Sequence, residues 1–206
     1  MAEAEALTDP LTGLANRRAM DAEIARALAD PGDAFGLIQI DLDLFKQIND
    51  SLGHAAGDAV LARVGHVLRH QLRLGDMAAR VGGDEFTALI RDCTDPAELS
   101  RIAARLIEAI EAPVIHHGQV CRISASIGIA LVNSYPDRPT PEQLTADADA
   151  ALYAAKRAGR GRYALHSERP VARGTDAPSP RPRRRADDAP PQGFRRRQTD
   201  QLPRPD

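Results

Sequence analysis

The sequence has few cysteines and no excess of basic charge. Its two cysteines, Cys93 and Cys121, lie far apart and form no C-x-x-C pair, so neither a disulfide framework nor a zinc site is indicated. A reducing, cytoplasmic location is therefore expected. With a formal net charge of -2, the chain lacks the strong basic field of a nucleic-acid-binding protein, and we predict no specific nucleic-acid partner. No run approaches the ~20 apolar residues of a membrane-spanning helix, so no membrane span is predicted either.

Composition divides the chain into three parts. Residues 1–7 form a short N-terminal stub, and residues 8–166 have the apolar content of one packed domain. From 167 to 206, Pro, Arg, Asp and Gln predominate, which predicts a disordered Pro/Arg-rich tail. Two triple-Arg clusters, 183–185 and 195–197, could contact nucleic acid or anionic lipid. Nearby Asp residues reduce the local positive charge of these clusters, and aromatic side chains that could stack on bases are scarce. A solvated tail is therefore favoured.

Hydrophobic periodicity predicts helices alternating with strands. Apolar residues recur at helical spacing in 16–29, 56–74, 96–111 and 141–158. Strand-like apolar runs occur at 35–41, 79–81, 86–90, 114–115, 120–131 and 163–165. The glycine-containing loop between two of these runs is typical of a β-hairpin. Helices interleaved with hairpins favour an α+β fold, in which helices flank a mixed, mostly antiparallel, ferredoxin-like sheet.

Two acidic segments indicate a divalent metal site. The D-L-D segment at 41–43 ends an apolar strand, where carboxylates need solvent, a cation or another partner. Alone, such a segment is more often a polar strand end. The G-G-D-E loop at 82–85 adds the hard oxygen ligands of Asp84 and Glu85 beside two glycines that allow close backbone approach. Alone, this loop would be only a tight polar turn, but together the segments favour metal binding.

A cation, an amide and a carboxylate follow the first acidic segment within one short stretch. They are Lys46, Asn49 and Asp58. Their clustering near one strand end favours a pocket for phosphate and a nucleobase.

Five stretches resemble the GGDEF-domain diguanylate cyclase family and cover about 8–165. The longest is I-D-L-D-L-F-K-Q-I-N-D-S-L-G-H-A-A-G-D at 40–58. The others are R-V-G-G-D-E-F at 80–86, D-P-L-T-G-L-A-N-R-R at 9–18, I-S-A-S-I-G-I-A at 123–130 and A-D-A-A-L-Y-A-A-K-R-A-G-R-G-R-Y at 148–163. The resemblance implies a palm-like nucleotidyl cyclase fold and an enzyme that condenses two GTP into cyclic di-GMP and pyrophosphate.

The resemblance also implies the roles of individual residues. Two Mg²⁺ or Mn²⁺ ions per active site would be held by Asp41, Asp84 and the backbone carbonyl of Leu42. Glu85 would join the two aspartates as a catalytic residue that helps to activate the attacking 3'-hydroxyl.

The same resemblance assigns the substrate contacts. Asn49 and Asp58 would recognise guanine, because a carboxylate accepts from donors that adenine lacks. Phosphate and the rest of the substrate would be held by Phe45, Lys46, Lys156 and Arg160. Since Lys156 and Arg160 are four residues apart on the predicted last helix, we expect them to share one face.

An R-x-x-D string is expected to bind the product. Arg73 and Asp76 stand nine and six residues before Gly82, where the family has its inhibitory site. The string is common by chance, so its position within the matched domain supports the assignment. Arg101 or Arg105 on the following helix could complete the site.

The symmetry of cyclic di-GMP favours a homodimer in which each copy holds one GTP. Because only about seven residues precede the domain, either the chain is a fragment of a longer protein or dimerisation comes from elsewhere. Two alternatives remain open. One is a non-catalytic cyclic di-GMP receptor that uses Arg73 and Asp76. The other is a palm-like cyclase or polymerase that acts on another nucleotide.

Overall fold

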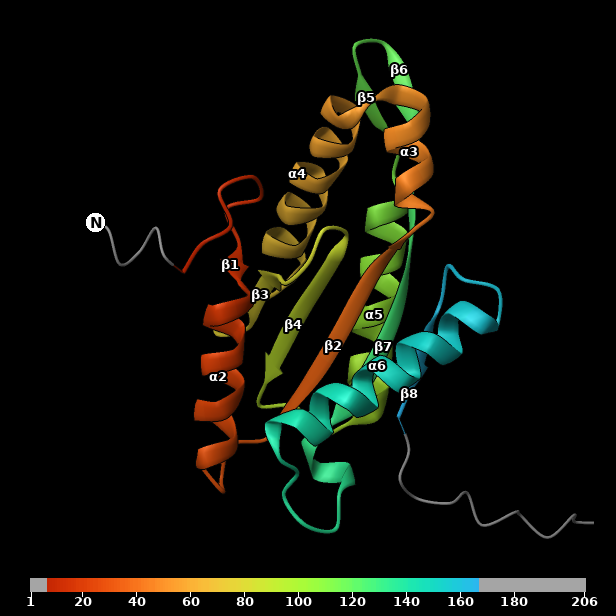
Figure 1. The fold of residues 1–206 in the computed structure, drawn as a ribbon. Coiled ribbons are helices and arrows are strands. Elements are labelled where there is room, and N and C mark those ends of the chain that lie inside the picture. Colours follow the sequence, from red (N-terminus) through yellow and green to blue (C-terminus); the bar gives the residue numbers. More distant parts are fainter. Residues whose placement is uncertain (1–6, 167–206) are drawn as a thin grey trace, which may run out of the picture. The chain divides into compact units, whose positions relative to one another are not determined.

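The longest strand, β2 (Phe35–Asp43), explains why helices cover both faces of the sheet. In the computed structural model, which describes residues 7–166, successive β2 side chains enter different cores. Figure 1 shows β2 in the sheet between β4 (Glu85–Arg91) and β7 (Ser124–Leu131). Phe35 and Leu37 pack with α2 (Arg17–Ala29) and α6 (Pro141–Arg157). The opposite face, which includes Ile38 and Ile40, packs with α4 (His54–Gln71) and α5 (Pro96–Glu111). Because side chains alternate between the two faces of a strand, helices pack on both faces of the sheet, and the domain has three layers.

The main sheet has six strands and is mostly antiparallel. Its order is β1 (Ala15–Asn16), β3 (Met77–Arg80), β4 (Glu85–Arg91), β2, β7 (Ser124–Leu131) and β8 (Tyr163–Leu165). The four central strands pair antiparallel, whereas each edge strand pairs parallel with its neighbour. A separate hairpin comprises β5 (Val114–His116) and β6 (Gln119–Cys121). The predicted α+β class is confirmed.

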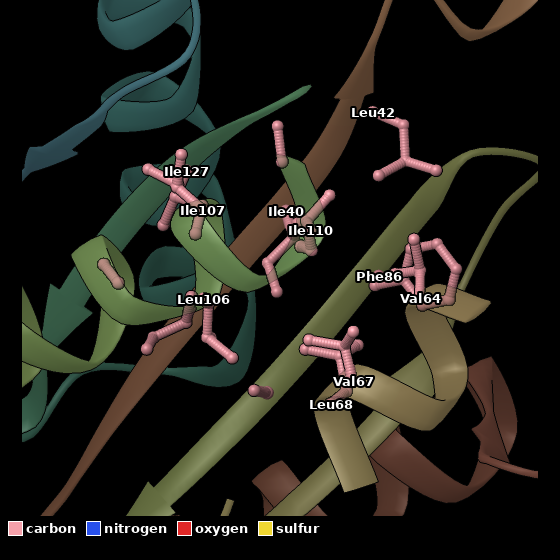
Figure 2. Packing of buried hydrophobic residues seen from close by; sticks show 14 of the residues in the cluster. Ile40, Leu42, Val64, Val67, Leu68, Phe86, Leu106, Ile107, Ile110 and Ile127 are labelled. Carbon is pink, nitrogen blue, oxygen red and sulfur yellow. The ribbon is translucent and has the colours of Figure 1, made fainter. Parts of the chain in front are cut away.

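The larger core lies between the sheet and the α4–α5 layer. Figure 2 shows Ile40 and Phe86 from neighbouring strands packed with Val64 and Leu68 of α4 and Leu106 of α5. These side chains are almost fully buried. The core fixes the β2–β4 pair at its centre, and the end of this pair carries the acidic segments.

Several predicted boundaries were wrong. The structure has an additional helix, α3 (Phe45–Leu52), directly after β2, and it is separated from α4 by Gly53 with φ of 86°. The helix predicted over 56–74 therefore starts at His54 and ends at Gln71. The strand predicted over 120–131 is interrupted between β6 and β7. A short 3₁₀ helix, η1 (Val132–Ser134), and strand β1 were not predicted.

None of the helices in residues 7–166 has both the length and the apolar character of a membrane-spanning segment. The predicted tail, 167–206, and most of the predicted stub lie outside the described residues.

Candidate functional site

Strand register brings the two acidic segments together. Asp41 near the end of β2 lies opposite Glu85, the first residue of β4. One residue further, the Leu42 amide donates a hydrogen bond of 3.1 Å to the carbonyl oxygen of Asp84. The Leu42 side chain is buried, so only its backbone is available to a ligand. Asp41 and Asp43 project to the opposite face, toward α6, because they are offset from Leu42 by one residue.

Two arginines outside the predicted site hold the 82–85 loop. Arg80 donates from Nε and Nη2 to the Gly83 carbonyl oxygen, at 3.1 and 2.8 Å, and pairs with Asp9 at 3.3 Å. Arg17 donates to the Val81 carbonyl oxygen at 2.8 Å. Its guanidinium also lies 3.8 Å from the carboxylate of Glu85. These contacts restrain the loop that presents the acidic residues.

Asp41 lies in a crowded electrostatic environment. Its carboxylate pairs with the Lys156 ammonium group of α6 at 2.6 Å. Burial raises the pKa of Asp41, the neighbouring carboxylates of Asp84 and Asp43 act in the same direction, and Lys156 opposes them. The negative charges of Asp84 and Asp43 near Asp41 favour the binding of a cation at this strand end.

The donor set fits Mg²⁺ or Mn²⁺ bound together with a nucleotide. Hard oxygen ligands are available from the carboxylates of Asp41 and Asp84 and from the carbonyl group of Leu42. Among residues 7–166, no three His, Cys, Asp or Glu side chains form a complete metal cage. Mg²⁺ bound with a nucleotide usually takes one or two protein carboxylates and the substrate phosphates as ligands.

Helices α3 and α4 place the predicted base-binding residues side by side. Gly57 on α4 leaves room for the Asn49 side chain, because a Cβ atom at Gly57 would lie 2.0 Å from Asn49 Oδ1. Asp58 is the next residue and is exposed, as is Lys46 in the first turn of α3. The Phe45 ring is buried against the same glycine, so it forms a wall of this region.

The prediction that Lys156 and Arg160 share a face of the last helix was wrong. Helix α6 ends at Arg157, and Arg160 lies in the turn that follows. Gly159, Arg160 and Gly161 all have positive φ, which ends the helix. Lys156 reaches Asp41, whereas Arg160 lies 3.9 Å from Asp43 and is half-exposed.

The R-x-x-D residues form a separate site. Arg73 and Asp76 are near the end of β4 that is opposite the acidic loop, and they line a hollow of about 600 Å³ with His70, Glu98, Arg101 and Arg105. The Asp76 side chain is buried, and its two oxygens accept from the Arg73 amide at 3.2 Å and the Arg91 amide at 3.1 Å. Its contacts therefore hold the turn. Arg73 lies 4.0 Å from Glu98, Arg105 donates to the Gln71 carbonyl oxygen at 2.8 Å, and Arg101 adds further positive charge to the hollow.

The structure thus places an acidic strand end beside a glycine-rich hairpin on a mostly antiparallel sheet of the palm-like type. The family model "Diguanylate cyclase, GGDEF domain" matches residues 6–162. The chain belongs to this family.

Named relatives agree with this assignment. The diguanylate cyclase TpbB of Pseudomonas aeruginosa is 43% identical over 161 residues, which are 76% of this chain and 37% of TpbB. The chain thus spans little more than a third of that relative.

Solved structures of GGDEF domains are similar as well. The TpbB domain from Pseudomonas aeruginosa is 42% identical with a TM-score of 0.72, and the match covers 78% of this chain and 94% of that one. The coiled coil and GGDEF domain of DgcB from Caulobacter crescentus, solved with c-di-GMP, is 30% identical with a TM-score of 0.74. That match covers 80% of this chain and 87% of the other. The predicted fold and family are confirmed.

Proposed function

We propose that this domain is a diguanylate cyclase that converts two GTP into cyclic di-GMP and two pyrophosphates. The observation that carries the proposal is the junction of β2 and β4. This junction brings together the Asp41 carboxylate, the Leu42 backbone and the hairpin loop with Asp84 and Glu85. Lys156 of α6 also contacts Asp41 there. This junction combines oxygen ligands for divalent ions with a cation for phosphate, which phosphoryl transfer requires.

The residues of this chain would bind and orient GTP in the following way. Asn49 and Asp58 would hydrogen-bond the guanine edge, and Phe45 would close the base region. Lys46, Lys156 and Arg160 would hold the phosphates. Lys156 would exchange its contact with Asp41 for a phosphate oxygen as ligands arrive. Asp41, Leu42 and Asp84 would hold two Mg²⁺ or Mn²⁺ ions, which when bound neutralise the triphosphate and polarise the α-phosphorus.

The reaction needs two copies of the domain in a homodimer. Each 3'-oxygen would attack the α-phosphorus of the opposing GTP, which forms a phosphodiester bond and breaks the bond to the bridging oxygen of pyrophosphate. Glu85 would help to accept the proton from the 3'-hydroxyl, and the contact with Arg17 would restrain its carboxylate. Two equivalent links require two equivalent half-sites, so a two-fold arrangement is the simplest solution.

Product inhibition would occur at the separate hollow. Arg73, Arg101 and Arg105 line it and offer guanidinium groups to the phosphates or guanines of cyclic di-GMP. Asp76 would keep the turn in place and present its remaining lone pairs. This hollow also supports the alternative proposal, in which the domain is a non-catalytic cyclic di-GMP receptor.

Replacement of one metal ligand tests the proposed activity. We expect Asp84→Ala to reduce cyclic di-GMP formation by at least about 100-fold, because the hairpin would lose a metal ligand and a turn residue costs little stability. The matched control is Asp137→Ala, an exposed carboxylate before α6, which should retain full activity. Wild-type turnover in Asp84→Ala would contradict the assignment. Product binding without turnover in the unmodified protein would favour the receptor.

A further inference from the structure

The second aspartate of the D-L-D segment is engaged differently from the first. Asp43 is buried, and its Oδ1 atom accepts a hydrogen bond of 2.8 Å from the Ser126 hydroxyl group on β7. Its Oδ2 atom accepts a hydrogen bond of 3.0 Å from the Gly161 amide. The guanidinium of Arg160 lies 3.9 Å from the same carboxylate. Asp43 thus joins the end of β2 to a turn that is 118 residues away in the chain.

The turn that Asp43 holds has an unusual backbone. Gly159, Arg160 and Gly161 have φ of 117°, 61° and 57°. A non-glycine residue in the left-handed region is disfavoured, so surrounding contacts must maintain Arg160 there. Helix α6 supplies one of them, since the Arg160 amide donates to the Ala155 carbonyl oxygen at 3.2 Å. The Arg162 Nε atom also donates to the Arg160 carbonyl oxygen at 3.1 Å, and Asp43 holds the next residue, Gly161.

The two aspartates contact one continuous segment of the chain. Asp41 pairs with Lys156 in the last turn of α6, and Asp43 holds the turn at 159–161. Both carboxylates lie on the α6 face of β2 because they are two residues apart on a strand. On the same face of the sheet, α6 approaches the neighbouring strand β7 closely at Gly128, where a Cβ atom would lie 2.0 Å from the Ala148 carbonyl oxygen. The strand end therefore sets the positions of Lys156 and Arg160 together.

We propose that Asp43 is a positioning residue that holds the 159–161 turn, so that Arg160 is presented to the phosphates of the substrate. Both Asp43 oxygens already have donors, which distinguishes it from Asp41 as a metal ligand. The Arg160 side chain is half-exposed, so it can leave the carboxylate and reach a bound phosphate while the Gly161 hydrogen bond remains. This inference rests on the proposed function in one respect, the phosphate contact of Arg160.

Steady-state kinetics of single and double variants test the proposal. We expect Arg160→Ala to raise the KM for GTP about tenfold with little change in kcat, because a phosphate contact acts in the ground state and the transition state alike. Asp43→Ala should raise KM about five- to tenfold. The double variant should resemble Arg160→Ala alone, since Asp43 acts through the turn. Asp43→Asn keeps an acceptor for the Gly161 amide and should stay within about threefold of wild type.

A binding comparison and a matched control separate positioning from general instability. Asp43→Ala should weaken competition by GDP but not by guanosine, which has no phosphate. The control is Asp147→Ala on α6, where the carboxylate accepts from the Tyr135 hydroxyl at 2.8 Å. This variant should lose stability with an unchanged KM. An unchanged KM in Asp43→Ala, or a double variant whose KM effects multiply, would overturn the proposal.

Amide exchange gives a readout that does not depend on activity. By nuclear magnetic resonance, the Gly161 amide should exchange with solvent at least about tenfold faster in Asp43→Ala than in wild type or Asp147→Ala. If wild-type protein forms no cyclic di-GMP and this exchange still accelerates, the proposed function fails while the anchoring of the turn by Asp43 stands. If the protein is active and neither exchange nor KM changes, the positioning role is refuted.

Discussion

Arg138 should be among the most important exposed-loop residues for stability. It lies before α6, yet its guanidinium donates to four backbone carbonyl oxygens at the end of α2 and in the loop that follows. The acceptors are Ala27 at 2.6 Å, Leu28 at 2.8 Å, Asp33 at 2.8 Å and Pro31 at 3.3 Å. The last carbonyls of a helix have no partner within the helix, and a cation there also interacts favourably with the helix dipole.

The cost of removing this side chain can be estimated from these contacts. A hydrogen bond from a charged donor contributes about 1.5–3 kcal/mol net, and water would replace part of the lost bonding at this partly exposed position. We expect Arg138→Ala to lower the free energy of unfolding by about 2–4 kcal/mol, or Tm by roughly 5–12 °C for a domain of this size. Arg138→Lys should recover less than half, because an ammonium group cannot reproduce the planar fork.

Urea unfolding followed by circular dichroism measures the effect. Arg26→Ala on α2 is the matched control, because Arg26 is exposed and, among residues 7–166, pairs only with Glu23 at i, i+3. Glu23 keeps its contact with Arg91 in that variant, so a loss below about 0.5 kcal/mol is expected. The reasoning is refuted if Arg138→Ala and Arg26→Ala unfold at the same urea concentration.

Two further predictions concern the base region and the N-terminal turn. Gly57→Ala should raise the KM for GTP about tenfold while the domain remains folded, because the new Cβ atom would displace the Asn49 carboxamide. An unchanged KM would exclude Asn49 from substrate binding. Burial tends to raise the pKa of Asp9, but hydrogen bonds from Thr12 and the charge of Arg80 lower it overall. Its carboxylate therefore stabilises the fold above the ordinary pKa of about 3.8, and this contribution is lost as pH falls through the lower folded value. Urea unfolding across this acidic range should show a shallower pH dependence in Asp9→Asn, and an identical dependence would contradict the assignment.

Local patterns predicted the elements whose sequence signals are strong. The run at 35–41 is short and apolar, and the glycine-rich loop at 82–85 separates two apolar strands, so both were recognised. Helix α3 was missed because it has only two turns and starts after Leu44, whose φ is 60°. Its helical face is too short to stand out from the acidic segment before it.

Contacts between distant residues could not be predicted from local pattern. The Arg80–Asp9 pair spans 71 residues, and the Arg17 contact with Val81 spans 64. Both contacts depend on the parallel pairing of β1 with β3. This pairing could not be predicted, because a strand of two residues has no recognisable sequence pattern. The prediction that Arg160 lies on the last helix was wrong for a related reason. The four-residue spacing from Lys156 placed Arg160 on the helix, although that helix was predicted only to 158; the flanking glycines and the distant Asp43 determine the turn instead.

The central claim is that this domain makes cyclic di-GMP from GTP. The most direct measurement incubates the purified chain with GTP and Mg²⁺ or Mn²⁺ over a range of protein concentrations, with ATP in parallel, and separates the products by chromatography. We predict cyclic di-GMP and two equivalents of pyrophosphate from GTP only, with a rate that rises faster than linearly with protein concentration because two copies must meet. Absence of product from GTP at every concentration with either metal, or equal turnover of ATP, would contradict the account.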